Sequence, residues 1–143
     1  MNSIAIVYWS GTGNTEQMAF AVEEGVRRAG GRAVLLQPGE FDAERLGTFD
    51  AVAFGCPAMG AEEREEGEFA PMFEDLEDGL SGRRVALFGS YGWGDGQWMR
   101  DWADRCRSHG AELLQPEGLI ANEAPDEAAL DACRALGEEL ARW

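Results

Sequence analysis

The chain has 143 residues, with 27 Asp or Glu against 12 Arg, no Lys and one His, so its formal net charge is −15. This length predicts a single domain over residues 1–143, and an apolar fraction of 45% is enough for a hydrophobic core. The excess of acid argues against nucleic acid and anionic membranes as partners, and the missing Lys excludes P-loop and Schiff-base chemistry.

Short apolar runs alternate with helical periodicity along the whole chain. The runs are typical of strands buried on both faces and lie at residues 4–8, 33–36, 51–54 and 85–88, with a weaker one at 112–120 that Pro116 interrupts. Helices are predicted at residues 14–29, 69–80, 98–106 and 125–143, and a short helical turn at 42–46.

This alternation predicts βαβ units and an α/β fold, namely a three-layer, doubly wound sheet of five parallel strands. In such folds the ligand binds at the carboxyl ends of the strands, where the strand order reverses. The loops after the first, third and fourth strands, at residues 9–15, 56–67 and 89–96, are therefore the expected site.

The first of these loops reads Ser10-Gly11-Thr12-Gly13-Asn14-Thr15 and joins a strand to a helix. Hydroxyls, an amide and the backbone N–H groups of a helix N-terminus together favour a phosphate group. The loop lacks the Lys of a P-loop, and residue 16 is Glu where a dinucleotide fingerprint needs a third Gly. We expect a phosphate monoester held without a cation; the alternative is an ordinary polar turn capped by Asn14 or Thr15.

The other two loops carry large side chains among small ones. Met59 and Gly60 follow the third strand, and Trp93 stands among glycines after the fourth. Trp93 is a candidate platform for a flat aromatic ligand, although packing against the next helix is the alternative. For Met59 the alternative is core filling. Together the loops predict a pocket for a planar ring with a phosphate tail.

Three widely spaced cysteines, Cys56, Cys106 and Cys133, form neither a disulfide nor a metal-binding pattern. They are expected to be small buried side chains in a reducing compartment. The first residues lack the basic segment of a signal peptide, and no stretch approaches the roughly 18 apolar residues of a membrane span. We expect a cytoplasmic protein without a metal site.

The three loops, in this order and spacing, resemble those of the flavodoxin family, and most closely the short-chain type with Met and Trp around the flavin. Residues 121–127 are similar as well, so the resemblance covers essentially the whole chain. It implies strand order 2-1-3-4-5 and non-covalently bound FMN. It also implies a low-potential electron carrier, not an enzyme, that shuttles between the semiquinone and hydroquinone.

The resemblance also implies which residues bind FMN and what some of them do. Met59 and Trp93 would enclose the flavin ring, Glu62 would accept from its N3–H, and the Gly60 carbonyl would turn toward N5–H. The phosphate would be held by loop amides and the side chains of Ser10, Thr12, Asn14 and Thr15. The full expected set is Ser10, Gly11, Thr12, Gly13, Asn14, Thr15, Pro57, Ala58, Met59, Gly60, Ala61, Glu62, Gly89, Ser90, Tyr91, Gly92, Trp93, Gly94 and Asn122.

Two positions depart from the pattern of some relatives. Pro57 stands where some carry a Ser that reaches the phosphate, so that donor is lost here. Ala61 follows Gly60 where some carry Asp or Ser, which changes the setting of the carbonyl that would turn toward N5–H.

Acid is concentrated beside the second loop. Residues 62–78 hold nine acidic residues and one Arg, for a net charge of 1 − 9 = −8. One like charge about 10 Å from a reduced, anionic flavin costs roughly 0.8 kcal/mol at an effective dielectric constant of about 40. The segment is thus expected to lower the second reduction potential and to attract redox partner proteins with basic surfaces. The alternative is a solvated helix face.

Three other classes of protein are alternatives to the electron carrier. An NAD(P)H-dependent FMN or quinone reductase needs cations for a second phosphate-rich ligand, which this chain has few of. A phosphate-accepting receiver domain needs a Lys and is excluded. An activator specialised for one partner enzyme stays open, as do the identities of donor and acceptor. A monomer is expected.

Replacing Trp93 with Ala tests the stacking interpretation. If the indole stacks on FMN, the variant should bind FMN more weakly by about 1–3 kcal/mol, the range for nucleic-acid bases that stack on aromatic side chains. Fluorescence titration of the apoprotein measures this, and unchanged affinity would show that Trp93 only packs against the protein.

Overall fold

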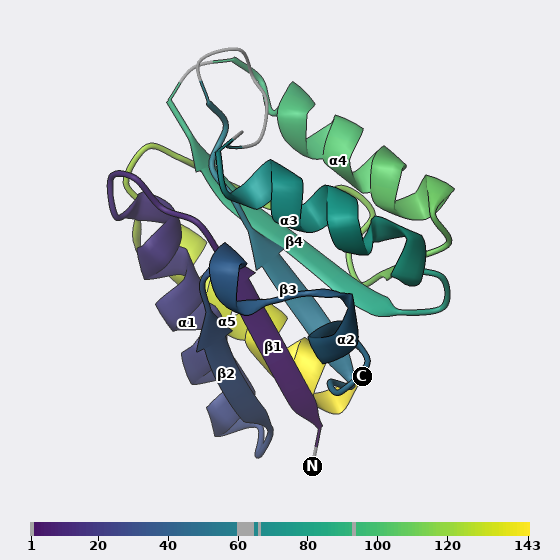
Figure 1. The fold of residues 1–143 in the computed structure, drawn as a ribbon. Helices are drawn as coiled ribbons and strands as arrows, with labels where there is room; N and C mark the ends of the chain where they lie inside the picture. The colour runs from purple at the N-terminus through teal and green to yellow at the C-terminus, as the bar shows by residue number, and fades with distance from the viewer. Residues whose placement is uncertain (1, 60–64, 66, 93) are drawn as a thin grey trace.

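A computed structural model describes residues 2–59, 65, 67–92 and 94–143 and has three layers, with helices on both faces of one sheet (Figure 1). The strands are β1 (Ser3–Tyr8), β2 (Arg32–Leu36), β3 (Ala51–Gly55), β4 (Arg84–Tyr91), β5 (Glu112–Leu113) and β6 (Leu119–Asn122). They pair in the order β2-β1-β3-β4-β5, all in parallel, and β6 also pairs with β4. The predicted α/β fold and strand order are confirmed.

The edge beyond β4 differs from the single strand predicted at residues 112–120. β5 pairs with the start of β4, with Arg84 opposite Glu112, and β6 pairs with its end, with Phe88 opposite Leu119. Pro116 lies between the two and has no N–H to donate to a ladder, so one strand becomes two short ones. β4 itself runs on to Tyr91, because β6 continues the ladder past the predicted end at residue 88.

Helices α1 (Asn14–Arg28) and α5 (Glu127–Arg142) cover one face of the sheet, and α2 (Ala43–Leu46), α3 (Phe69–Leu76) and α4 (Gln97–Ser108) cover the other (Figure 1). The predicted turn at 42–46 is α2, which begins where the Asp42 carboxylate accepts from the Arg45 N–H. The helix predicted over 69–80 ends earlier, at Leu76, and continues as the 3-10 turn η2 (Glu77–Gly79). A second such turn is η1 (Pro38–Glu40).

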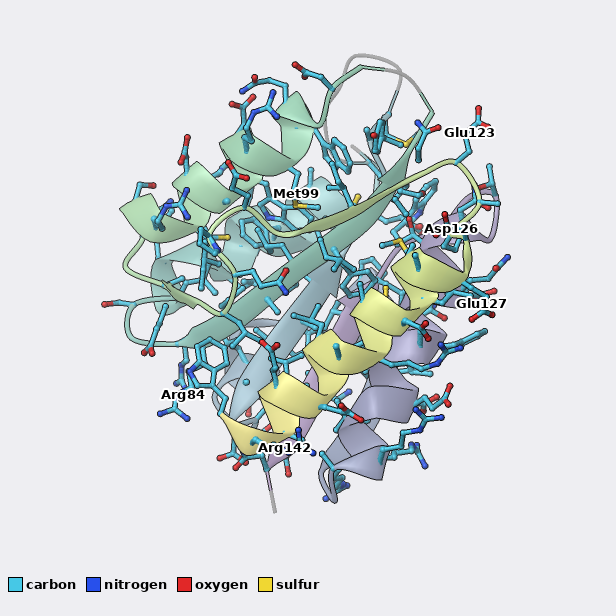
Figure 2. The ribbon with its side chains drawn as sticks, turned by 180° about the vertical axis from the view of Figure 1, so that it is seen from behind. Arg84, Met99, Glu123, Asp126, Glu127 and Arg142 are labelled. Carbon is cyan, nitrogen blue, oxygen red and sulfur yellow. The ribbon has the colours of Figure 1, made fainter. Side chains whose placement is uncertain are left out.

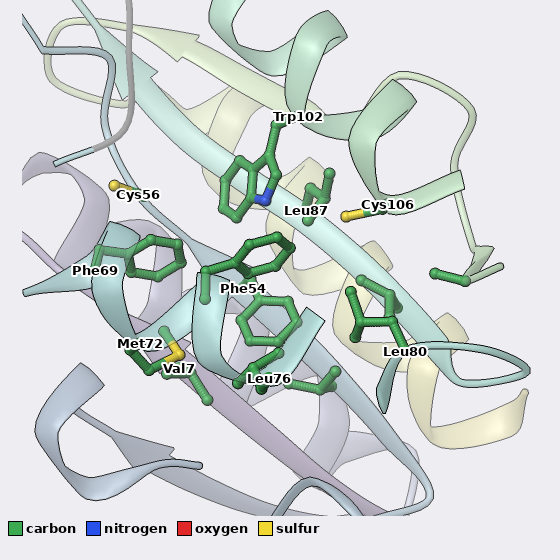
Figure 3. Close-up of a cluster of buried hydrophobic side chains, with 14 of the residues drawn as sticks. Val7, Phe54, Cys56, Phe69, Met72, Leu76, Leu80, Leu87, Trp102 and Cys106 are labelled. Carbon is green, nitrogen blue, oxygen red and sulfur yellow. The ribbon is translucent and has the colours of Figure 1, made fainter. Parts of the chain in front are cut away.

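Alternate strand residues feed two hydrophobic cores. Ile4 and Ile6 of β1 face α1 and α5, whereas Ala5 and Val7 face the other helices. Figure 3 shows the core between the sheet and the helices α2, α3 and α4, where aromatic rings of β3, α3 and α4 meet edge to face. Trp98 and Trp102, predicted to be core residues on a helix stripe, are each 2% exposed.

Helices α1 and α5 approach closely because glycines lie at their contact. A Cβ atom added to Gly137 would stand 2.1 Å from the Val22 carbonyl oxygen, and one on Gly25 would stand 1.9 Å from the Arg134 carbonyl oxygen. This packing holds α1 against the sheet and so fixes where its N-terminus lies relative to the end of β1.

Candidate functional site

A pocket of about 220 Å³ lies at the carboxyl ends of β1, β3, β4 and β6. Its described lining residues are Trp9, Gly11, Thr12, Asn14, Pro57, Ala58, Met59, Ser90, Tyr91, Gly92 and Glu123. The structure thus brings the three predicted loops together at one edge of the sheet. This is the place where a doubly wound sheet binds its ligand, since helix N-termini and loops converge there.

The first loop leads into α1 through Gly13. Its φ of 94° lies in the left-handed region that favours glycine, and it is the N-cap of α1 with no side-chain cap bond. The cap that the alternative interpretation assigned to Asn14 or Thr15 is wrong, because both residues lie inside the helix. The N-terminus of α1 keeps backbone N–H groups for an external acceptor.

The first loop bends around the side chain of Ser10, whose hydroxyl oxygen accepts hydrogen bonds from two backbone N–H groups. The Ser10 Oγ atom accepts from the N–H groups of Gly13 at 3.1 Å and Glu16 at 3.3 Å. Within the described chain, the amides of Gly11, Thr12 and Thr15 have no acceptor. A cluster of such amides with nearby hydroxyls is the donor set that a phosphate requires, so the loop fits the phosphate of FMN.

Thr15 and Ser90 join the first loop to β4. Both are buried, at 1% and 4% exposure, and their Oγ atoms lie 3.0 Å apart. The Ser90 N–H also donates to the Thr15 hydroxyl at 3.3 Å. Ser90 lines the pocket and Thr15 does not, so the Thr15 hydroxyl holds the loop against the sheet.

Several other residues of the expected set do not line the pocket, namely Ser10, Gly13, Gly89, Gly94 and Asn122. A Cβ atom on Gly89 would lie 2.2 Å from the Cys56 carbonyl oxygen, so this glycine serves close packing beneath the site. The Asn122 side chain donates to the Tyr91 carbonyl oxygen at 3.4 Å and ties β6 to the rim. The expected contacts of Gly60, Ala61, Glu62 and Trp93 lie outside the described residues.

Two lining residues were missed by the sequence reasoning. Trp9 follows β1 directly, and its indole Nε1–H donates to Glu68 Oε2 at 2.7 Å. Glu123 follows β6, has a φ of 55° and donates its N–H to the Tyr91 carbonyl oxygen at 2.6 Å. A large aromatic side chain at the carboxyl end of a strand was the available signal for Trp9, as it was for Trp93.

The acidic segment is not one uniform face. The Glu65 carboxylate, in a residue that is 9% exposed, accepts from the N–H groups of Gly67, Glu68 and Phe69 at 2.6–3.0 Å and so caps α3. Burial alone would raise the pKa of Glu65, but the three backbone hydrogen bonds together outweigh it and the pKa is lowered. Glu65 also donates its own N–H to Cys56 Sγ at 3.3 Å.

Glu77, at the other end of the segment, has a different role. Its two carboxylate oxygens accept from Arg105 Nε at 2.6 Å and Nη2 at 2.7 Å, and His109 Nε2 lies 3.4 Å from one of them. This bidentate pair raises the pKa of Arg105 and links η2 to α4. The negative charge of Glu77 is thus largely offset.

In the part of the chain that the structure describes, no group of three or more His, Cys, Asp or Glu side chains is placed to hold a metal ion. Nor is any helix there long and apolar enough to cross a membrane. None of the described residues that line the pocket is basic.

The chain is similar to known proteins of one family. A family model described as flavodoxin matches residues 6–137. The chain is 43% identical to the flavodoxin of Clostridium beijerinckii over 136 residues, which cover 95% of this chain and 97% of that one. It is also 43% identical to the flavodoxin of Megasphaera elsdenii over 139 residues, covering 97% and 98% of the two chains. The solution structure of the two-electron reduced Megasphaera elsdenii protein superposes with a TM-score of 0.87 at 42% identity, over 98% of this chain and 99% of that one.

Replacing Glu65 with Gln should lower the free energy of unfolding at pH 7 by about 1 kcal/mol, the usual value of a helix cap. A lowered pKa in the folded state means that the stabilisation is present above the ordinary value of 4.5 and is lost as the pH falls through the lowered pKa. The difference in free energy of unfolding between Glu65→Gln and the unmodified protein should therefore disappear at acidic pH. Urea unfolding at a series of pH values measures it.

Asp75→Asn is the matched control, because Asp75 is exposed on the same helix. A difference that persists unchanged at acidic pH, or equal stability at pH 7, would contradict the capping role of Glu65.

Proposed function

The chain belongs to the flavodoxin family and is an FMN-binding electron carrier, and we propose that FMN binds in the pocket at the carboxyl ends of β1, β3, β4 and β6. The cofactor supplies the redox chemistry, because its ring system takes up and releases electrons one at a time. The protein binds, orients and shields it. The observation that supports the proposal most directly is that one pocket is lined by both the first loop and a group of apolar residues. The first loop supplies hydrogen-bond donors and has no Arg or Lys.

The first loop is the proposed phosphate end of the site. The amides of Gly11, Thr12 and Thr15 and the hydroxyl of Thr12 would donate to the phosphate oxygens, and the N-terminus of α1 adds its positive partial charge. Ser10 stands behind the lining residues, but among the described residues its Oγ atom only accepts, from Gly13 and Glu16, so its hydroxyl hydrogen would be a further donor. Charge-assisted bonds from several fixed donors can hold a dianion without an ammonium or guanidinium group.

The proposed ring end is formed by Pro57, Ala58, Met59, Tyr91 and Gly92, all of which line the pocket. The Ala58 N–H donates to the Ser90 carbonyl oxygen at 2.9 Å, and the Tyr91 ring lies 5.6 Å from that of Trp98. These contacts fix the apolar wall before any ligand binds. Trp93, Gly60, Ala61 and Glu62 complete this end in the proposal on the strength of their sequence pattern alone.

Negative charge near the site supports a low potential for the second electron. Glu68 and Asp75 of the acidic segment are exposed, and Glu123 lines the pocket. Adding an electron to a site flanked by carboxylates costs Coulomb energy, which lowers the potential of that step. Arg105 offsets the charge of Glu77, whereas Glu65 stays ionised because its pKa is lowered, so Glu65 and the exposed acids together produce this effect.

The charge distribution also favours partner proteins with a basic surface. Glu123, Asp126 and Glu127 lie toward the pocket end of the molecule, whereas Arg84 and Arg142 lie at the opposite end (Figure 2). A basic partner is therefore drawn toward the flavin edge, which speeds encounter without requiring tight binding. We further propose that the protein acts as a monomer in the cytoplasm, where its three buried thiols stay reduced.

Ser10→Ala tests the phosphate end. The variant should bind FMN about tenfold more weakly, because a hydrogen bond to a charged group contributes roughly 1.5 kcal/mol or more. Riboflavin, which has no phosphate, should bind as it does to the original protein. Ser108→Ala, at the far end of α4, is the control. Equal losses for both ligands would place the phosphate elsewhere.

Ionic strength tests the proposed partners. The rate of electron transfer to a basic acceptor protein should fall several-fold between about 10 mM and 500 mM salt, because screening shortens the reach of the acidic surface. Stopped-flow measurement with an uncharged small acceptor as control isolates the effect. A rate that is flat across this range would contradict a docking role for the acids.

A further inference from the structure

One contact joins the acidic segment to the phosphate loop. The Nε1–H of Trp9 donates to Glu68 Oε2 at 2.7 Å, which makes a charge-assisted hydrogen bond. We propose that Glu68 is a positioning residue for Trp9, and that it fixes the indole as a wall at the phosphate end of the pocket. This inference rests on the proposed function, because it assumes that the phosphate lies at the first loop.

Both partners of this bond are held in place at their backbones. The Glu68 N–H donates to Glu65 Oε1 at 2.6 Å, and Glu68 is the N-cap of α3. The Trp9 N–H donates to the Gly55 carbonyl oxygen at 3.0 Å, which continues the pairing of β1 with β3. A side chain with two rotatable bonds, held at its backbone and at one ring atom, has a single orientation.

The indole held in this way covers the first turn of the loop. A Cβ atom on Gly11 would lie 2.9 Å from Trp9 Cη2, so the ring sits directly against the Gly11 backbone. Trp9, Gly11, Thr12 and Asn14 line the pocket together. Gly11 and Thr12 are themselves exposed, so Trp9 is a side wall of the open pocket. With a ligand in place the indole would limit the water that reaches the phosphate, and each hydrogen bond to a drier phosphate contributes more.

Charge and positioning have opposite effects on ligand preference. Glu68 is negative, so removing its charge alone should favour an anionic ligand over a neutral one. Losing the acceptor for the Trp9 N–H frees the indole and should weaken the phosphate-bearing ligand selectively. The sign of the change thus separates the two roles.

The test compares the affinities of the apoprotein for FMN and riboflavin in Glu68→Ala and Glu68→Gln. Both variants lose the same charge, but only the Gln side chain keeps an oxygen that can accept from Trp9. Glu68→Ala should lower the preference for FMN by about fivefold to tenfold, and Glu68→Gln should stay within about twofold of the original. Asp75→Asn removes the charge of an exposed acid on the same helix, and the preference should not fall and should stay within about twofold of the original.

A second readout follows the bond without any flavin. In the ¹⁵N–¹H spectrum of the apoprotein, the Trp9 indole resonance, assigned through Trp9→Phe, should move upfield in Glu68→Ala and much less in Glu68→Gln.

Three results would overturn the inference: an unchanged or raised FMN preference in Glu68→Ala, an equal loss in both variants, or an indole resonance that does not move. If the original protein itself bound FMN no better than riboflavin, the proposed phosphate site would fail, and this inference with it. If the unmodified protein and Glu68→Ala both preferred FMN to riboflavin by the same factor, the phosphate site would stand and only the positioning role of Glu68 would be overturned.

Discussion

A protein with a net charge of −15 and no Lys has to hold a doubly negative phosphate, and this electrostatic constraint shapes the rest of the site. The structure offers backbone amides and hydroxyls in place of a cation, and it orients them through the N-terminus of α1. That arrangement works only if the loop is rigid. The Ser10 bonds, the Thr15–Ser90 pair and the contact of α1 with α5 supply the rigidity.

The acidic residues then divide into groups with different physical roles. Glu65 caps α3, and Glu77 joins η2 to α4 through Arg105. Glu68 is hydrogen-bonded to Trp9, which packs on the first loop, and Glu68 and Asp75 are both exposed. Arg105 offsets the charge of Glu77, so the effective charge of residues 62–78 is smaller than their count suggests. Glu65 stays ionised, because its backbone hydrogen bonds lower its pKa.

Sequence reasoning could place the loops, because the strand and helix periodicities locate the carboxyl ends of the strands. It failed where a residue's role depends on a distant partner. Gly89 and Ser90 resemble loop residues, yet β6 extends their strand. The role of Thr15 depends on Ser90, 75 residues away, and that of Glu77 on Arg105. Trp9 is a local signal that could have been used, since it stands directly after β1.

A crystal structure of the protein with FMN bound tests the central claim, that the phosphate is held without a cation. We expect the phosphate oxygens within hydrogen-bonding distance of the Ser10 and Thr12 hydroxyls and of the amides of residues 11–15, with no Arg side chain within about 4 Å, the limit of an ion pair. An Arg guanidinium on the phosphate, or a phosphate bound away from the first loop, would contradict it.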